Sequence, residues 1–312
     1  MKNNKVIIGT RGSKLALWQS KWVESSLRQA HEQLEIDLRI IHTTGDKILD
    51  TALSNIGDKG LFTKEIEQQL SHGNIDLAVH SLKDLPTILP EGLSIAVVTA
   101  REDPADVLIS KNSLTLEQLP KGAVVLTGSL RRRAQLLHRR SDLHIRDVRG
   151  NVPTRLRKLD ESDAQAVIMA AAGLKRLGLH DRITQRLDPV DFLPACGQGA
   201  LAIEIRSDDK KIAALIRLLN DAETRITTTA ERVVLAELEG GCQIPIGAYA
   251  ELQNSNLLLR AMIADLAGTK LITAQAAGPA EDPEKLGRQV ARKLLDMGGN
   301  EILTQVRNEF KL

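Results

Sequence analysis

The feature that most constrains the fold is an alternation of short aliphatic runs with helical patterns over the first two thirds of the chain. Residues 6–8 form a β-branched run, and residues 14–27 follow with apolar side chains at helical spacing. Such alternation is typical of α/β folds, in which helices cover the faces of a sheet. We expect further strands at 38–41, 75–79, 95–98, 107–109, 124–126, 144–148, 166–169 and 201–205, and helices at 63–70, 130–138 and 154–159.

The pattern changes after residue 208, where strands and helices no longer alternate. The expected order is two helices, three strand-like runs and two closing helices: 210–219, 222–238, 246–252, 257–263, 270–276, 284–295 and 301–310. Consecutive strands followed by helices predict a small α+β domain with an antiparallel sheet. The Pro- and Gly-rich stretch 192–199 between the two regions is expected to be a linker.

Composition disfavours several classes of function. A net charge of +2 and an aromatic content of 2% argue against a nucleic-acid binder. The seven histidines show neither HxxxH spacing nor a neighbouring CxxC, so we expect no metal site. No segment approaches the roughly 20 apolar residues of a membrane helix. Two cysteines in 312 residues favour a reducing, cytoplasmic compartment.

Four turns that follow predicted strands carry cations and hydroxyl groups. In α/β folds ligands bind outside the carboxyl ends of strands, so we expect these turns to converge on one cleft for an anion. Ser13 and Ser129 are suited to cap helix N-termini, which attract anions. Arginines in the first turn of a helix oppose its dipole, which suggests that a ligand compensates them. A solvated basic face is the alternative. The turns are 9–13, 80–84, 127–133 and 149–155.

Two further residues stand out by their surroundings. Asp84 is a carboxylate beside Lys83 in a cationic turn, where it is either an ion-pair partner or a group that stabilises positive charge and moves protons. Cys242 follows two glycines and precedes Pro245, a setting that leaves a thiol accessible. Accessible thiols act as nucleophiles, metal ligands or attachment points. A cysteine hydrolase that pairs Cys242 with His80 is a weak possibility, because no orienting residue is visible near either one.

Seven motifs, in order along the whole chain, resemble the porphobilinogen deaminase (hydroxymethylbilane synthase) family. Any one of them could arise by chance, whereas the ordered set is specific. The motifs are GTRGSKLALWQ at 9–19, GLFTKE at 60–65, HSLKDLPT at 80–87, SLRRRAQL at 129–136, RGNV at 149–152, GQGAL at 197–201 and EGGCQIP at 239–245.

The resemblance implies an α/β fold of three domains. The first two would be lobes like those of periplasmic binding proteins, with the chain crossing between them twice, near 100–103 and 192–199. The third would be a small C-terminal α+β domain that carries Cys242. The expected domains are residues 1–100 with 199–218, residues 101–198, and residues 219–312.

The resemblance also implies a transferase that condenses four porphobilinogen molecules into hydroxymethylbilane and releases ammonia. One dipyrromethane cofactor per chain would be held by Cys242 through a thioether bond, and Asp84 would be the catalytic carboxylate. Porphobilinogen would be the small-molecule partner of a monomeric, cytoplasmic enzyme of heme biosynthesis, with no metal, nucleic acid or membrane. Cofactor and substrate contacts are expected from Arg11, Ser13, Lys59, Ser81, Lys83, Thr127, Ser129, Arg131, Arg132, Arg149, Arg155, Arg176 and Gln198.

The chain departs from the family pattern in three places. Gly128 stands where relatives more often have serine, which removes a hydroxyl and could permit close backbone approach. Asn55 stands where relatives often have lysine, and Cys196 where they have a small apolar residue; we interpret Cys196 as structural. The alternative function is a two-lobed protein that binds a polycarboxylate without catalysis, which would need the cations but neither Asp84 nor Cys242.

Overall fold

The computed structural model describes residues 5–47, 60–238 and 244–310, and these form two compact units. Unit 1 contains residues 5–47, 60–102 and 200–225, and unit 2 contains residues 103–199, 226–238 and 244–310. The chain passes from one unit to the other after Glu102, after Gly199 and after Arg225.

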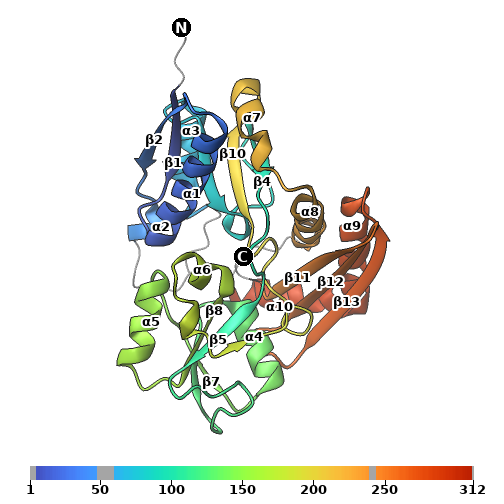
Figure 1. Cartoon of the computed structure of the whole chain (residues 1–312). Helices are drawn as coiled ribbons and strands as arrows, with labels where there is room; N and C mark the ends of the chain where they lie inside the picture. The colour runs from blue at the N-terminus through green and yellow to red at the C-terminus, as the bar shows by residue number, and fades with distance from the viewer. Residues whose placement is uncertain (1–4, 48–59, 239–243, 311–312) are drawn as a thin grey trace. The chain divides into compact units, whose positions relative to one another are not determined.

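Unit 1 is built on a five-stranded mixed sheet of order β2-β1-β3-β10-β4 (Figure 1). Strand β1 runs parallel to β2 and β3, whereas β10 is antiparallel to both β3 and β4. The strands are β1 (Lys5–Thr10), β2 (Glu35–Ile40), β3 (Leu77–Ser81), β4 (Leu93–Val98) and β10 (Leu201–Arg206).

Helices cover both faces of this sheet because its strands are apolar on both sides. One face packs against α1 and α7 through a core that includes Val23, Val79 and Ile212. The other face packs against α3 through Ile66, Leu70 and Ala78. The helices of unit 1 are α1 (Lys14–Ala30), α2 (Thr44–Lys47), α3 (Lys64–Ser71) and α7 (Lys210–Ile216), with the short 3₁₀ turns η2 (Leu82–Asp84) and η4 (Arg217–Leu219).

Unit 2 contains a second five-stranded mixed sheet, of order β7-β6-β8-β5-β9. Strand β6 is parallel to its neighbours β7 and β8, and β5 is antiparallel to β8 and β9. The strands are β5 (Asp106–Ser110), β6 (Val124–Leu126), β7 (His144–Arg146), β8 (Ala166–Ala170) and β9 (Gln185–Arg186). The helices that belong to this sheet are α4 (Leu130–Arg139), α5 (Val152–Glu161), α6 (Ala171–Arg176) and the 3₁₀ turn η3 (His180–Arg182).

The last part of unit 2 is a three-stranded antiparallel meander, β11-β12-β13, with helices packed against it. A single apolar core joins the strands to these helices, with Val234, Leu259, Val290 and Val306 among its fully buried members. The elements are β11 (Ile246–Gln253), β12 (Asn256–Ala264), β13 (Leu271–Pro279), α8 (Ala222–Glu237), α9 (Pro283–Leu294), the π-helical turn η5 (Leu295–Gly299) and α10 (Asn300–Phe310). The first turn of α8, residues 222–225, is counted with unit 1.

The α/β class and the small C-terminal sheet expected from the sequence are confirmed. Every strand and helix expected from the sequence is present, with ends shifted by a few residues, and α2, α6 and β9 are additional. The stretch 192–199 precedes the change from unit 2 to unit 1 and is well packed: Phe192 and Gln198 are fully buried, and the carbonyl oxygen of Pro194 accepts a hydrogen bond from the Ala248 amide. No helix in the described ranges is both long and apolar enough to span a membrane.

Candidate functional site

In unit 1 the two cationic turns leave parallel, paired strands, so both lie at one edge of the sheet. The turn after β1 is fixed where it enters α1, because Ser13 Oγ accepts a hydrogen bond from the Ala16 amide at 3.2 Å. Thr10 Oγ1, fully buried, donates to the Ala16 carbonyl oxygen at 3.2 Å. Ser13 therefore caps α1 as the sequence predicted. Gln19 Nε2 of the same helix donates to Ser81 Oγ at 2.8 Å and so joins the two turns.

Arg11 lies over the aromatic ring of Phe62, with the guanidinium carbon 4.1 Å from the ring centroid. A cation over an aromatic face gains about 0.5–2 kcal/mol, depending on how far it is desolvated. Phe62 belongs to the turn that leads into α3, so this contact connects the segments after β1 and before α3. The side chain of Arg11 is half-buried rather than free in solvent.

Lys83 and Asp84 lie in η2, directly after β3. This turn is fixed by its neighbours: Leu82 and Leu85 are buried, and the Leu82 amide donates to the Ala200 carbonyl oxygen at 3.0 Å. Lys83 is half-buried and Asp84 is exposed. The structure therefore presents a carboxylate to solvent at the same sheet edge as Arg11.

In unit 2 the other two cationic turns follow β6 and β7, which are also parallel neighbours. Ser129 Oγ accepts a hydrogen bond from the Arg132 amide at 3.5 Å and caps α4, again as predicted. Thr127 is 2% exposed, and its Oγ1 accepts from the Ser129 amide at 3.2 Å. A Cβ at Gly128 would lie 2.9 Å from the Val148 carbonyl oxygen, so glycine permits the close backbone approach.

The turn after β7 brings Arg149 and Arg155 to this edge. Asn151 caps α5 by accepting hydrogen bonds from the Thr154 amide and hydroxyl, at 3.0 and 2.9 Å. Arg155 Nε donates to the Gly150 carbonyl oxygen at 2.8 Å. Arg149 Nη2 is buried and has no hydrogen-bond partner among the described residues. Burial lowers the pKa of Arg149, and the nearby charge of Asp147 opposes the shift.

Arg131 and Arg132 are both 5% exposed and share one carboxylate, that of Asp106. Arg131 Nη1 donates to Asp106 Oδ2 at 2.7 Å, and Arg132 Nη2 donates to Oδ1 at 2.8 Å. Burial by itself raises the pKa of Asp106, but the charges of the two arginines outweigh it and hold the pKa well below its usual range. Burial lowers the pKa of Arg131, and the Asp106 charge opposes that shift.

Sequence reasoning missed Asp106. The sequence did contain a signal: Asp106 is an acidic residue at the start of an otherwise apolar strand. A carboxylate buried there requires cationic or amide donors, so its presence predicts such partners. The positive charges of Arg131 and Arg132 were expected to be balanced by a ligand. The structure shows that Asp106, a residue of the same unit, balances part of this charge.

Gln198 and Arg176 both make protein contacts in unit 2. Gln198 Nε2 donates to the Pro104 carbonyl oxygen at 2.7 Å and to Asp106 Oδ1 at 2.9 Å, and its side chain is fully buried. Arg176 Nη2 donates to the Gly199 carbonyl oxygen at 2.6 Å, which ties the end of α6 to the start of the chain crossing.

The predicted site residues therefore fall into two groups, one in each unit. Lys59 and Cys242, like Asn55, lie outside the described residues. Cys196 is buried, and no disulfide joins it to another described residue. In unit 1 the group is Arg11, Ser13, Ser81, Lys83 and Asp84, and in unit 2 it is Thr127, Ser129, Arg131, Arg132, Arg149, Arg155, Arg176 and Gln198.

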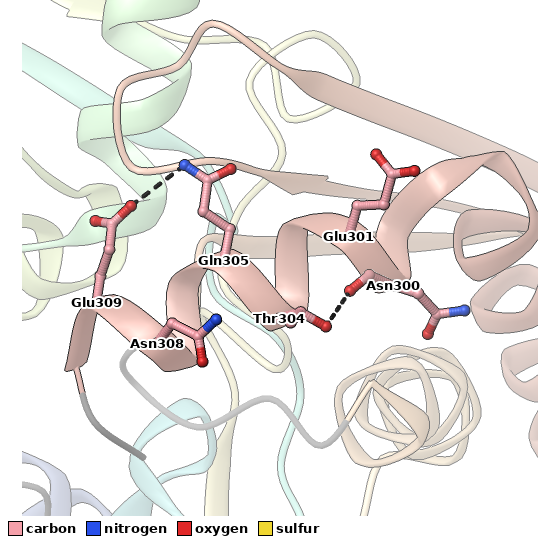
Figure 2. A pocket seen from close by; sticks show the side chains of 6 residues that line it. All are labelled: Asn300, Glu301, Thr304, Gln305, Asn308 and Glu309. Carbon is pink, nitrogen blue, oxygen red and sulfur yellow. Dashed lines mark hydrogen bonds between the residues drawn. The ribbon is translucent and has the colours of Figure 1, made fainter.

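A surface hollow elsewhere in unit 2 is lined by a single helix, α10 (Figure 2). Figure 2 shows polar side chains along one side of this helix, with Gln305 Nε2 donating to Glu309 Oε1 at 3.3 Å. None of the predicted site residues lines it. In the described part of the chain, no three His, Cys, Asp or Glu side chains are arranged to hold a metal ion.

Fold and site together define an α/β protein with arginines, lysine and capped helix N-termini at the carboxyl ends of its strands, an arrangement suited to a ligand with several carboxylates. The chain belongs to the porphobilinogen deaminase family. The family model for the porphobilinogen deaminase dipyrromethane cofactor-binding domain matches residues 6–214, and that for the C-terminal domain matches residues 225–296.

Curated relatives agree over the full length of the chain. The porphobilinogen deaminase of Desulforudis audaxviator is 54% identical over 303 residues, covering 97% of this chain and 98% of the relative. That of Prochlorococcus marinus strain AS9601 is 50% identical, covering 100% and 99%. The chain is therefore an enzyme of heme biosynthesis with a dipyrromethane cofactor, and the alternative of a binding protein without catalysis is not supported.

Among solved structures, the methionine-binding protein MetQ is similar over 71% of this chain and 92% of its own, with 14% identity and a TM-score of 0.44. Nothing about the function of this chain follows from a likeness at that level.

The described residues fit the cofactor. A dipyrromethane derived from two porphobilinogen units carries acetate and propionate groups, and these need cationic or N–H donors. Arg149 offers a buried guanidinium nitrogen that no described residue contacts by a hydrogen bond, and Arg131 and Arg132 together hold one more positive charge than Asp106 balances. These donors match the carboxylate chemistry of the cofactor.

Proposed function

We propose that this porphobilinogen deaminase joins four porphobilinogen molecules head to tail into hydroxymethylbilane, starting from a dipyrromethane attached to Cys242 by a thioether bond. The observation that carries the proposal is made within each unit separately. In unit 1 the exposed carboxylate of Asp84 lies at the same sheet edge as Arg11, and in unit 2 Arg149 and Arg155 follow a strand that is parallel to its neighbour. Arg149 Nη2, which is buried and has no hydrogen-bond partner in the described part of the chain, is the donor most in need of a ligand oxygen.

The cations hold the carboxylates of the substrate and of the growing chain. Each pyrrole adds an acetate and a propionate, so negative charge accumulates as pyrroles are added. Planar guanidinium groups pair with carboxylates through two parallel hydrogen bonds, which suits them to this task better than lysine. Lys59 and Lys83 add positive charge, and Ser13, Ser81, Thr127 and Ser129 add hydrogen-bonding hydroxyl groups. The remaining proposed contacts to ligand carboxylates come from five arginines: Arg11, Arg131, Arg132, Arg149 and Arg155. Arg176 and Gln198 are further proposed contacts with less support.

Asp84 handles the positive charge that the reaction creates. Loss of ammonia from porphobilinogen leaves a cationic methylene group conjugated with the pyrrole, and an ionised carboxylate nearby stabilises it. When bound, the dipyrromethane supplies the pyrrole α-carbon at which the first carbon–carbon bond forms. Asp84 would contact the pyrrole N–H groups and would help to move the proton lost by the attacking carbon to solvent.

The domain arrangement, oligomeric state and location belong to the same proposal. Residues 1–100 with 199–218 and residues 101–198 form the two lobes, and residues 219–312 form a third domain that carries Cys242. The enzyme acts as a cytoplasmic monomer on porphobilinogen, without nucleic acid or membrane.

Intact mass measurement tests the covalent attachment. The purified active protein should exceed its sequence mass by about two pyrrole units, and Cys242→Ser should lack this adduct while the control Cys196→Ser keeps it. An active protein with the bare sequence mass would sink the attachment to Cys242.

Turnover and binding, measured together, test Asp84. Asp84→Asn should lose about 100-fold or more in kcat while it retains the cofactor adduct, because general acid–base and charge-stabilising groups contribute factors of that size. Unchanged turnover would refute the role of Asp84.

A further inference from the structure

Asp106 is a fully buried carboxylate that the proposed chemistry does not use directly. It is the first residue of β5, and its carboxylate accepts hydrogen bonds from the side chains of three residues: Arg131, Arg132 and Gln198. Its environment is therefore made by the residues expected to contact the cofactor and substrate rather than by the apolar core.

Both carboxylate oxygens of Asp106 accept hydrogen bonds. Oδ2 accepts from Arg131 Nη1 at 2.7 Å. Oδ1 accepts from Arg132 Nη2 at 2.8 Å, from Arg132 Nε at 3.1 Å and from Gln198 Nε2 at 2.9 Å. Because every one of these bonds is donated to the carboxylate, the geometry is that of an ionised acid.

Each arginine is also anchored to the backbone of unit 2. Arg131 Nη1 donates to the Leu193 carbonyl oxygen at 2.6 Å, and Arg132 Nη1 donates to that of Ile168 at 3.2 Å. With Asp106 on one side and carbonyl oxygens on the other, neither guanidinium group can rotate without breaking charge-assisted hydrogen bonds.

The charges of this cluster do not cancel. Among the residues that the structure describes, two guanidinium groups pair with one carboxylate, which leaves a single surplus positive charge at a site whose arginines are 5% exposed. An uncompensated buried charge is unfavourable, so a cluster of this kind favours the approach of one further anion.

We propose that Asp106 is a positioning residue for substrate binding: it fixes the Arg131 and Arg132 guanidinium groups so that the cluster receives one ligand carboxylate. Asp106 acts through the arginines and does not touch the ligand. The inference rests on the proposed function, in which these arginines bind carboxylates.

A double-mutant cycle on steady-state kinetics separates positioning from general structural damage. Asp106→Asn should raise the KM for porphobilinogen about tenfold with kcat changed by less than about threefold, because it removes binding common to ground and transition states. In an Arg132→Gln background the same change should raise KM by less than about threefold, because Arg132 donates two of the hydrogen bonds to Asp106. An equal rise in both backgrounds would overturn the inference.

Asp160→Asn is the matched control, because Asp160 also accepts from an arginine of unit 2, Arg182, at 2.8 Å, but in an exposed pair. It should leave both kinetic constants unchanged. If Asp106→Asn does not fold, Asp106→Glu keeps the charge and displaces it by one methylene. A rise in KM of about threefold is then expected, and a wild-type KM contradicts the inference.

The cycle also distinguishes the positioning role from the proposed function on which it rests. If Arg132→Gln leaves KM unchanged, the carboxylate-binding role in the proposed function fails. If Arg132→Gln raises KM while Asp106→Asn does not, only the positioning role of Asp106 fails.

Discussion

Three consecutive arginines lie in the first turn of α4, and they occupy two different environments. Arg131 and Arg132 are buried against Asp106, whereas Arg133 is half-buried with an Nε that has no hydrogen-bond partner among the described residues. The run of cations showed that an anion was needed at this helix end, but it could not show which one. Asp106 lies 25 residues from Arg131 in sequence and meets it only because β5 and α4 belong to the same unit.

A second buried acid gives a prediction at the scale of single residues. Glu67 of α3 is 7% exposed and lies near His80 and Glu204, whose Nε2 and Oε2 atoms are 3.2 Å apart. Burial raises the pKa of Glu67 above its ordinary value of 4.5; the Thr63 hydrogen bond opposes the shift, the Glu204 charge adds to it, and His80 lowers it.

A raised pKa in the folded state stabilises the protein below the unfolded pKa, and this contribution is lost as pH rises through the folded pKa. The free energy of unfolding of the wild type should therefore fall, relative to Glu67→Gln, as pH rises from the ordinary pKa of 4.5 to the folded pKa. The fall should be at most about 1.4 kcal/mol for every tenfold drop in proton concentration. Denaturant unfolding across pH measures the difference. The exposed control Glu91→Gln should keep the wild-type slope, and an unchanged slope in Glu67→Gln would refute the prediction.

At the scale of elements, the recurring design is a strand, a short turn and a capped helix. Ser13, Ser129 and Asn151 each cap the helix that follows a functional turn. Replacing such a cap by alanine typically costs about 1 kcal/mol. The Ser13 and Ser129 caps were predicted from sequence because a side chain reaches the helix N-terminus within three residues, so the interaction is local; the Asn151 cap was found only in the structure.

Gly150, in the turn between β7 and α5, gives the prediction at the scale of elements. Its φ is +111°, and a Cβ would lie 2.6 Å from Thr154 Cγ2. Gly150→Ala should destabilise unit 2 by about 1–3 kcal/mol from backbone strain and also raise the KM for porphobilinogen, because Arg149 is its neighbour. Gly178→Ala is the control: its φ is +67° with nothing within 4 Å of the new Cβ, so it should cost less and leave KM unchanged. Equal effects of the two substitutions would argue against the close approach as the cause.

The whole molecule carries a net charge of only +2, yet several of its arginines follow the carboxyl ends of strands: Arg11, Arg131, Arg132, Arg149 and Arg155. Local concentration of one sign of charge attracts a charged ligand even when the net charge is small. The steady-state KM for a substrate with two carboxylates should therefore depend on ionic strength.

Raising salt from about 0.05 to about 0.5 M shortens the Debye length from roughly 14 to roughly 4 Å, so KM should rise severalfold with little change in kcat. Thermal unfolding under the same conditions controls for loss of folded protein. A KM that does not vary with salt would show that substrate carboxylates are not bound by partly exposed cations.

Features that depend on residues close together in the sequence were predicted correctly, whereas features that depend on distant residues were not. Strands and amphipathic helices such as α1 were predicted because their apolar spacing lies within one element. Helix α6 was not, since its Ala and Gly residues are buried without a periodic polar face, and the two residues of β9 are too few to show a pattern. The packing of the stretch 192–199 could not be predicted from its Pro and Gly content, because it depends on long-range contacts: the Leu193 carbonyl oxygen accepts from both Arg131 and Gln135.

The sequence by itself determined the α/β class, the helix caps and the motifs that identify the family, because each depends on residues close together in the chain. Only the tertiary structure decided which groups contact the cations. Asp106 accepts hydrogen bonds from Arg131 and Arg132, and also from Gln198, while Arg11 lies over the ring of Phe62. These partners come from different elements, and a buried charge is stable only where folding brings it a counter-charge or donors.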